Sequence, residues 1–226
     1  MRFQNIFRLF KVHTYKMICT LLTASTVLSH LSGQESWEEI KNAEGIRVFT
    51  KKVAGSEFKA FKSTGVIKAD VASFVALISD VESLENWGYK LKRTKLLERS
   101  GDTLQVYFAE AKAPFPYSNR YGIYRNLFKW DAMDRQLRIG IQLLNDASYA
   151  DEGLVLLTGQ GYWEVTVLPG GDLSVVFEMH VDPGKGIPGW LSNLFADESP
   201  FETMRSVKAE LLKQKYQDKR YDFLNN

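Results

Sequence analysis

The pattern of hydrophobic residues predicts an α+β fold, in which a curved antiparallel β-sheet is wrapped around a long C-terminal α-helix. The first observation is a run of segments with alternating apolar residues, most regular between Leu137 and Leu143. The second is a stripe at helical spacing near the end of the chain, formed by Phe201, Met204, Val207 and Leu211. One layer of sheet crossed by one long helix satisfies both observations.

The composition is that of an ordinary globular protein. The chain has 226 residues, of which 45% are hydrophobic and 25% are charged. It shows no internal repeat and no low-complexity linker, so we expect one domain over residues 34–226. The net charge is only +2 and the basic residues are spread along the chain. Nucleic-acid binding calls for a concentrated basic face, so we expect no nucleic-acid partner.

The N-terminal segment has the features of a signal peptide. Four basic residues precede the acid-free stretch from Met17 to Leu31, and the small residues Ser32 and Gly33 follow it. This order predicts a signal peptide over residues 1–33 and export to the periplasm or the exterior. An uncleaved amphipathic arm is the alternative. Cleavage would remove Cys19, the single cysteine, so we expect no disulfide.

The elements follow in a definite order. A capping box at residues 36–39 predicts a short helix that ends near Gly45, and residues 46–53 and 58–67 are predicted strands. Asp70 is expected to cap a helix whose apolar stripe includes Phe74 and Ile78, with a second helical piece around Trp87. Further strands are predicted over residues 89–98, 104–112, 120–130, 137–145, 154–168 and 173–181. The segment 146–153 is a predicted loop.

Several short motifs in this order resemble the START lipid-transfer family of the helix-grip superfamily. They are Asp80 with Trp87, Pro114-x-Pro116 with Ser118-x-Arg120, Gly161-Tyr162-Trp163, Asp182-Pro183-Gly184, Ile187-Pro188 and Trp190-Leu191. The resemblance implies a helix-grip fold with an interior tunnel between the sheet and the C-terminal helix. The family usually has Asp after the motif arginine, where this chain has Tyr121. This departure leaves open what Arg120 pairs with.

Glu110 is the most informative ionisable residue. It follows Leu104, Val106 and Phe108 on the same face of a predicted strand. A buried carboxylate is unfavourable without a partner, so we expect a pair with Arg120 or Arg125 on the next strand. The alternative is that this face turns to solvent at Glu110. The resemblance also suggests a carboxylate and an arginine inside the cavity.

The resulting candidates for the cavity lining combine three charged and five apolar or aromatic residues. They are Glu110, Arg120, Arg125, Phe108, Tyr124, Trp163, Phe177 and Met204. A metal site is not expected, because the chain would keep a single histidine, His180, after cleavage of the signal peptide. No cofactor is expected.

The sequence favours a carrier that binds a lipid or another apolar ligand and performs no chemistry on it. A cyclase-like or hydrolase-like enzyme on the same fold is the alternative, and a structural protein with a filled core is a third. Basic residues of the C-terminal helix suggest a transient contact with a membrane surface. Ligand uptake is expected between that helix and the loop at residues 146–153.

Overall fold

The computed structural model describes residues 36–149 and 153–225 of the chain. Within these residues, strands form one large sheet in the order β1-β2-β3-β10-β9-β7-β6-β5-β4, and β8 pairs in parallel with the start of β6. All neighbours in the main order are antiparallel. The strands are β1 Glu38–Ala43, β2 Ile46–Lys51, β3 Ala60–Ile67, β4 Leu91–Ser100, β5 Leu104–Ala111, β6 Arg120–Asp131, β7 Gln136–Leu144, β8 Val155–Leu156, β9 Thr158–Val167 and β10 Leu173–Asp182. The expected signal peptide, residues 1–33, lies outside the described residues.

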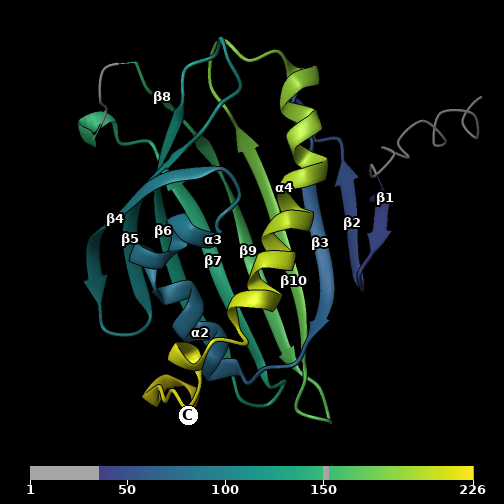
Figure 1. Ribbon diagram of the computed structural model, residues 1–226, viewed down its shortest axis with the longest axis vertical. Helices are drawn as coiled ribbons and strands as arrows, with labels where there is room; N and C mark the ends of the chain where they lie inside the picture. The colour runs from purple at the N-terminus through teal and green to yellow at the C-terminus, as the bar shows by residue number, and fades with distance from the viewer. Residues whose placement is uncertain (1–35, 150–152, 226) are drawn as a thin grey trace, which may run out of the picture. The chain divides into compact units, whose positions relative to one another are not determined.

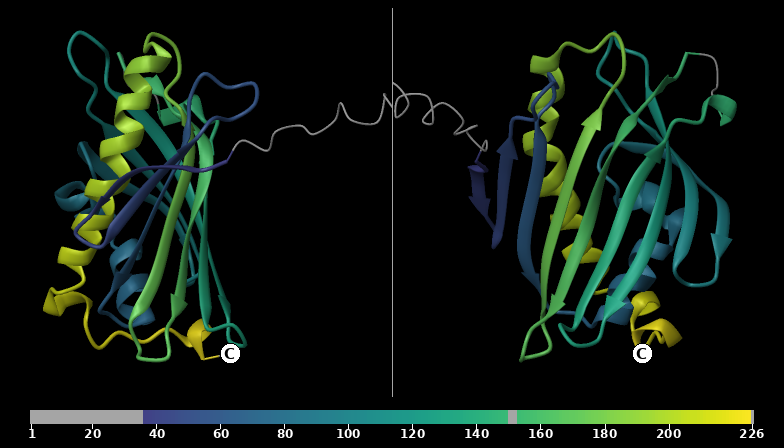
Figure 2. Two further views of the ribbon diagram at one scale, coloured as in Figure 1. Left: turned by 90° about the vertical axis from the view of Figure 1, so that its right-hand side faces the viewer. Right: turned by 180° about the vertical axis from the view of Figure 1, so that it is seen from behind.

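Helices cover one face of the sheet. The long helix α4, Gly189–Glu210, and the shorter α2, Val71–Ser79, both lie across the inner face (Figures 1 and 2). Helix α3, Leu84–Trp87, follows α2 after one turn of 3₁₀-helix. Seen from behind in Figure 2, the outer face of the sheet is toward the viewer and α4 passes behind it. The predicted helix-grip fold is therefore confirmed.

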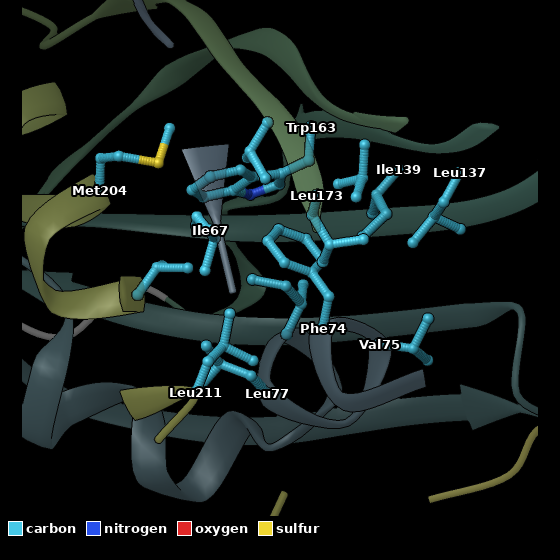
Figure 3. Packing of buried hydrophobic residues seen from close by; sticks show 14 of the residues in the cluster. Ile67, Phe74, Val75, Leu77, Leu137, Ile139, Trp163, Leu173, Met204 and Leu211 are labelled. Atoms are coloured by element: carbon cyan, nitrogen blue, oxygen red, sulfur yellow. The ribbon is translucent and has the colours of Figure 1, made fainter. Parts of the chain in front are cut away.

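Alternation along the strands decides which side chains face the helices. In β7 the buried residues alternate with partly or fully exposed ones, because successive side chains point to opposite faces. Figure 3 shows how the inner face packs: Phe74 of α2, Met204 of α4 and Trp163 of β9 meet in one apolar cluster. Phe74 and Met204 are both fully buried. The apolar stripe expected for the C-terminal helix is thus where the helix meets the sheet.

The ends of α2 are fixed by two aspartates. As predicted, Asp70 caps the N-terminus and accepts a hydrogen bond of 2.7 Å from the Ser73 amide. Asp80, at the other end, accepts bonds from Lys215 Nζ and the Tyr216 hydroxyl, each at 3.0 Å. These bonds, with one from Ser83, outweigh burial and hold the pKa of Asp80 below its usual value. The segment after α4 is therefore tied back to the end of α2.

The short helix predicted to start at the capping box of residues 36–39 and to end near Gly45 is wrong: β1 occupies this region and forms a hairpin with β2. Ala43 pairs with Ile46, and the two residues between them, Glu44 and Gly45, have φ of 54° and 67°. Positive φ at both positions is the geometry of a two-residue type I′ turn. Glu is rare in such a turn, so the sequence carries a weak hairpin signal there, and the pairing with β2 overrides the local capping pattern.

Candidate functional site

A cavity of about 310 Å³ lies between the inner face of the sheet and α4. Its lining is mainly apolar and comes from several strands, from α3 and from the first part of α4. Representative residues are Ile141 of β7, Trp163 of β9, Phe177 of β10, Trp87 of α3 and Ala196 of α4. The lining reaches the surface at the exposed residues Lys90 and Lys112 and at the partly exposed Pro114, and we call this region the mouth.

The described residues of α4 that line the cavity differ in size from those that anchor the helix to the sheet. The C-terminal half places large residues such as Met204 and Val207 against the sheet, and both are fully buried. The N-terminal half faces the cavity with Asn193, Ala196 and Ser199, which occur at three-residue spacing. Small side chains on one helix face cannot fill the space above a curved sheet. Space is therefore left under the first half of the helix.

Aromatic rings form much of the cavity wall. Trp163 and Phe177 are stacked with ring centroids 4.1 Å apart, and Tyr107 and Tyr124 are stacked at 5.1 Å. Burial raises the pKa of Tyr124 to about 12. Burial also raises the pKa of Tyr107, although a hydrogen bond from Asn126 acts in the opposite direction. Both tyrosines therefore remain neutral and present apolar rings with a polar tip.

Arg120 lines the cavity and is 4% exposed. Its guanidinium donates to the carbonyl oxygens of Pro183 at 3.2 Å and Lys185 at 3.1 Å, and also to that of Ser118. Burial lowers its pKa. Main-chain carbonyls thus stand where the family pattern suggested a carboxylate. Arg120 fixes the segment that precedes α4 to the start of β6.

Glu110 is buried as expected, with 1% exposure, but its predicted partners are wrong. It accepts hydrogen bonds from Lys92 at 2.9 Å, Arg93 at 2.7 Å and Asn119 at 2.8 Å. The register explains the difference, because Glu110 lies opposite Tyr121 on β6. Adjacent residues of a strand point to opposite faces, so Arg120 points into the cavity while Glu110 lies on the outer face.

Two other candidates lie on the outer face with Glu110. Phe108 packs with Tyr121 and Ile123 in a separate cluster. Arg125 is exposed and donates to the Gln142 side chain, so it is not a partner of Glu110. Met204 packs in the main core and is not among the residues that line the cavity. The structure therefore brings Arg120, Tyr124, Trp163 and Phe177 together at the cavity, and places the other four candidates elsewhere.

Sequence reasoning missed several lining residues, among them Tyr107, Ala109 and Asn126. Period-two alternation from Arg120 along β6 leads through Tyr124 to Asn126, so this residue could have been found. Tyr107 lies directly opposite Tyr124 on β5. Finding it requires the register of the hairpin, which the sequence did not define.

Neither the described part of the loop expected at the gate nor His180 contributes to the cavity lining. The described part of the loop, residues 146–149 and Gly153, contributes nothing to the lining. Residues 150–152 are outside the described part of the chain. His180 is hydrogen-bonded to Ser56 at 3.1 Å and is not a lining residue. Among the described helices, none combines the length and apolar character needed to cross a membrane.

Comparison with known proteins identifies similar chains in sequence and in structure. An uncharacterised protein of Pseudomonas aeruginosa is 28% identical over 178 residues, which are 77% of this chain and 86% of that protein. The phosphatidylcholine transfer protein of Rattus norvegicus is 27% identical over 162 residues, which are 70% of this chain and 75% of that protein. No family model matches the chain.

A solved structure of a lipid transfer protein is also similar to this chain. The STAR-related lipid transfer protein of Xanthomonas axonopodis has a TM-score of 0.73 and 29% sequence identity, and the match covers 78% of this chain and 99% of that one. The resemblance to START domains found in the motifs is therefore confirmed, and the chain has their helix-grip fold.

The outer-face position of Glu110 leads to a testable prediction. The bonds from Lys92, Asn119 and Arg93 outweigh burial and hold the pKa of Glu110 below its usual value. This stabilisation is present above the unfolded pKa of about 4.3 and is lost as the pH falls through the folded pKa. Glu110→Gln should therefore lower the free energy of unfolding at pH 7 by about 1–3 kcal/mol. Denaturant melts should show this difference shrinking at acidic pH.

The control is Glu164→Gln, on the same outer face, where Glu164 pairs with Arg138 and both side chains are partly exposed. This change should alter stability by about 1 kcal/mol at most. Neither variant should change the affinity for the apolar fluorophore 1-anilinonaphthalene-8-sulfonate. If Glu110→Gln weakens binding of the fluorophore without a loss of stability, the outer-face assignment is wrong.

Proposed function

We propose that the protein is a carrier that binds one lipid or similar apolar molecule in the cavity between the sheet and α4, and that it is not an enzyme. The observation that carries the proposal is the cavity itself, with its stacked aromatic wall and small-residue helix face. The names of the similar proteins from Rattus norvegicus and Xanthomonas axonopodis, both lipid transfer proteins, support it. The ligand would be held by burial of its apolar surface.

The size of the cavity limits what it accepts in this conformation. A volume of about 310 Å³ is at the small end of the range of roughly 300–1,000 Å³ seen for ligand pockets. It suits a single chain or a compact ring system. A larger ligand requires the cavity to widen, and the boundary that can move with the fewest broken hydrogen bonds is α4, because a helix satisfies its own backbone.

The N-terminal half of α4 is the movable part of this boundary in our proposal. Pro200 lies inside the helix and has no N–H, so the carbonyl of Ala196 lacks its usual helical donor. Across the mouth, the Tyr89 hydroxyl donates to Glu198 of α4, and Lys90 Nζ lies 3.9 Å from the same carboxylate. Uptake would then occur between α4 and the segment around Tyr89, in place of the loop at 146–153.

Contact with a membrane would occur at the mouth. Phe115 is 97% exposed and follows Pro114, which lines the cavity. Lys112 and Lys185, both exposed, come from the two segments next to it. An exposed aromatic side chain flanked by cations fits the interface of an anionic membrane.

Three of the basic residues near the end of the chain, which suggested membrane contact in the sequence, are engaged within the protein. Lys208 donates to the Glu44 carbonyl at 3.0 Å. Lys213 pairs with Glu210 and Lys215 pairs with Asp80. These contacts favour the mouth as the membrane-facing surface in our proposal.

Filling the cavity should abolish binding. Ala196→Phe introduces a ring at a lining position that is 6% exposed, and overpacking of this kind typically lowers stability by about 1–3 kcal/mol. We expect affinity for 1-anilinonaphthalene-8-sulfonate, measured by fluorescence titration, to fall at least about tenfold, a change of about 1.4 kcal/mol. Ala209→Phe, at an exposed position of the same helix, is the control and should bind as the wild type does. Equal affinity for both variants would place the binding site elsewhere.

Removing the exposed ring at the mouth should slow lipid transfer. Phe115→Ser should reduce binding to vesicles of phosphatidylglycerol and the rate of transfer of a fluorescent lipid between them, without a loss of stability. The control is Met133→Ser: Met133 is 95% exposed but follows the opposite end of β6. Should the two variants bind vesicles equally well, the mouth is not the docking surface.

Export is proposed from the basic and then apolar N-terminal segment. Sequencing the N-terminus of protein recovered from the periplasm or the culture medium should find a chain that begins near residue 34. Recovery of exported protein that still begins at Met1 would contradict cleavage.

A further inference from the structure

Asn126 carries a polar atom inside the cavity that the described residues leave unpaired. The residue lines the cavity and is 2% exposed, and its Oδ1 has no hydrogen-bond partner among the described residues. A side-chain hydrogen bond from Asn126 acts to lower the pKa of Tyr107, against the larger effect of burial. The amide oxygen of Asn126 is the acceptor that is left without a partner among the described residues.

The position of Asn126 is far from the mouth. Arg120 and Asn126 lie on the same face of β6, six residues apart, which corresponds to about 20 Å along a strand. We call the region around Tyr107 and Asn126 the deep end of the cavity. A ligand that reaches from the mouth to this end must have an extended apolar body, because the wall between them is formed by Tyr124, Leu157 and other apolar side chains.

The surroundings of the deep end are neutral. The strand neighbours of Asn126 are Gln105 on β5 and Ile141 on β7. The nearest cation in this hydrogen-bond network is Arg99, which donates to the Ser79 carbonyl and to Gln105, and it is not among the described lining residues. A ligand anion placed here would be buried without a counter-ion, which is strongly unfavourable.

An unpaired buried acceptor is unfavourable and uncommon in folded proteins. A ligand that donates a hydrogen bond to this acceptor removes the desolvation penalty of leaving it unpaired. Trp87 Nε1 is a second buried lining atom without a partner among the described residues, and it is a donor. The mainly apolar wall of the cavity therefore presents one acceptor and one donor that a ligand can bind.

We propose that the deep end is a subsite for a neutral hydrogen-bond donor of the ligand, which places a lipid alcohol with its hydroxyl on Asn126 Oδ1. The proposal rests on the proposed function and adds the chemical class of the ligand. Esters and ethers of the same length have acceptors but no donor, so they leave Asn126 unpaired. A carboxylate is excluded from this end by the absence of a counter-ion among the neighbouring described residues.

The test compares two isomeric probes of equal chain length, one with a donor and one without: dodecanol and methyl undecyl ether. Each is titrated against the wild-type protein loaded with 1-anilinonaphthalene-8-sulfonate, and displacement of the fluorophore gives the affinity. A buried acceptor left unpaired is expected to separate the two affinities by roughly tenfold in favour of the alcohol. Equal affinities for the two probes in the wild type overturn the proposal, whatever the variants do.

Variants then assign the preference to Asn126. Asn126→Leu has a similar shape and no acceptor, so the alcohol-to-ether ratio should fall to about one while the ether still binds. Ser63→Ala is the matched control, because Ser63 also has a buried oxygen without a partner among the described residues but is not a lining residue. It should keep the wild-type ratio. An unchanged ratio in Asn126→Leu also overturns the proposal.

The outcomes separate this inference from the function on which it rests. If neither probe displaces the fluorophore from the wild type, and the fluorophore itself binds equally well to Ala196→Phe, both the carrier function and the subsite are wrong. If both probes bind the wild type with the same affinity, the carrier function stands and the subsite is wrong.

Discussion

The packing of the C-terminal half of α4 against the sheet is the contact on which the rest of the structure depends. Met204 and Val207 are fully buried there and anchor the helix over the inner face. At the other end, Arg120 fixes the segment before α4 through two main-chain carbonyls, those of Pro183 and Lys185. Between these two attachments the helix lines the cavity with small or polar side chains, such as Ala196 and Ser199. A cavity therefore forms beneath a helix that is held at both ends.

The fold was predictable because its main signals are periodic and long. Strict alternation identified β7, and helical spacing identified α4 and its buried face, including Phe201 and Met204. The prediction of a helix at the start of the domain was wrong, because β1 is short and its hydrophobic pattern does not distinguish a helix from a strand. Its identity depends on pairing with β2 through the turn at Glu44 and Gly45, which is a non-local contact that no local pattern reports.

The site was only partly predictable, because the sequence shows which residues share a face of a strand but does not show how neighbouring strands are paired. Alternation placed Phe108 and Glu110 on one face of β5, and this is correct, since both lie on the outer face. Both faces of β5 are largely buried, however, so burial could not tell which one borders the cavity. The pairing register between β5 and β6 determines which face borders the cavity. It places Glu110 opposite Tyr121 on the outer face and leaves Arg120 on the other face.

The central claim is that the space under the first half of α4 holds one apolar molecule. Native mass spectrometry of the protein purified from its own host tests this most directly. We expect a mass above that of the chain by one lipid-sized molecule, which dissociates on activation and is absent from the Ala196→Phe variant. A wild-type protein that carries no added mass, and gains none after incubation with lipid extract from the same host, would contradict the account.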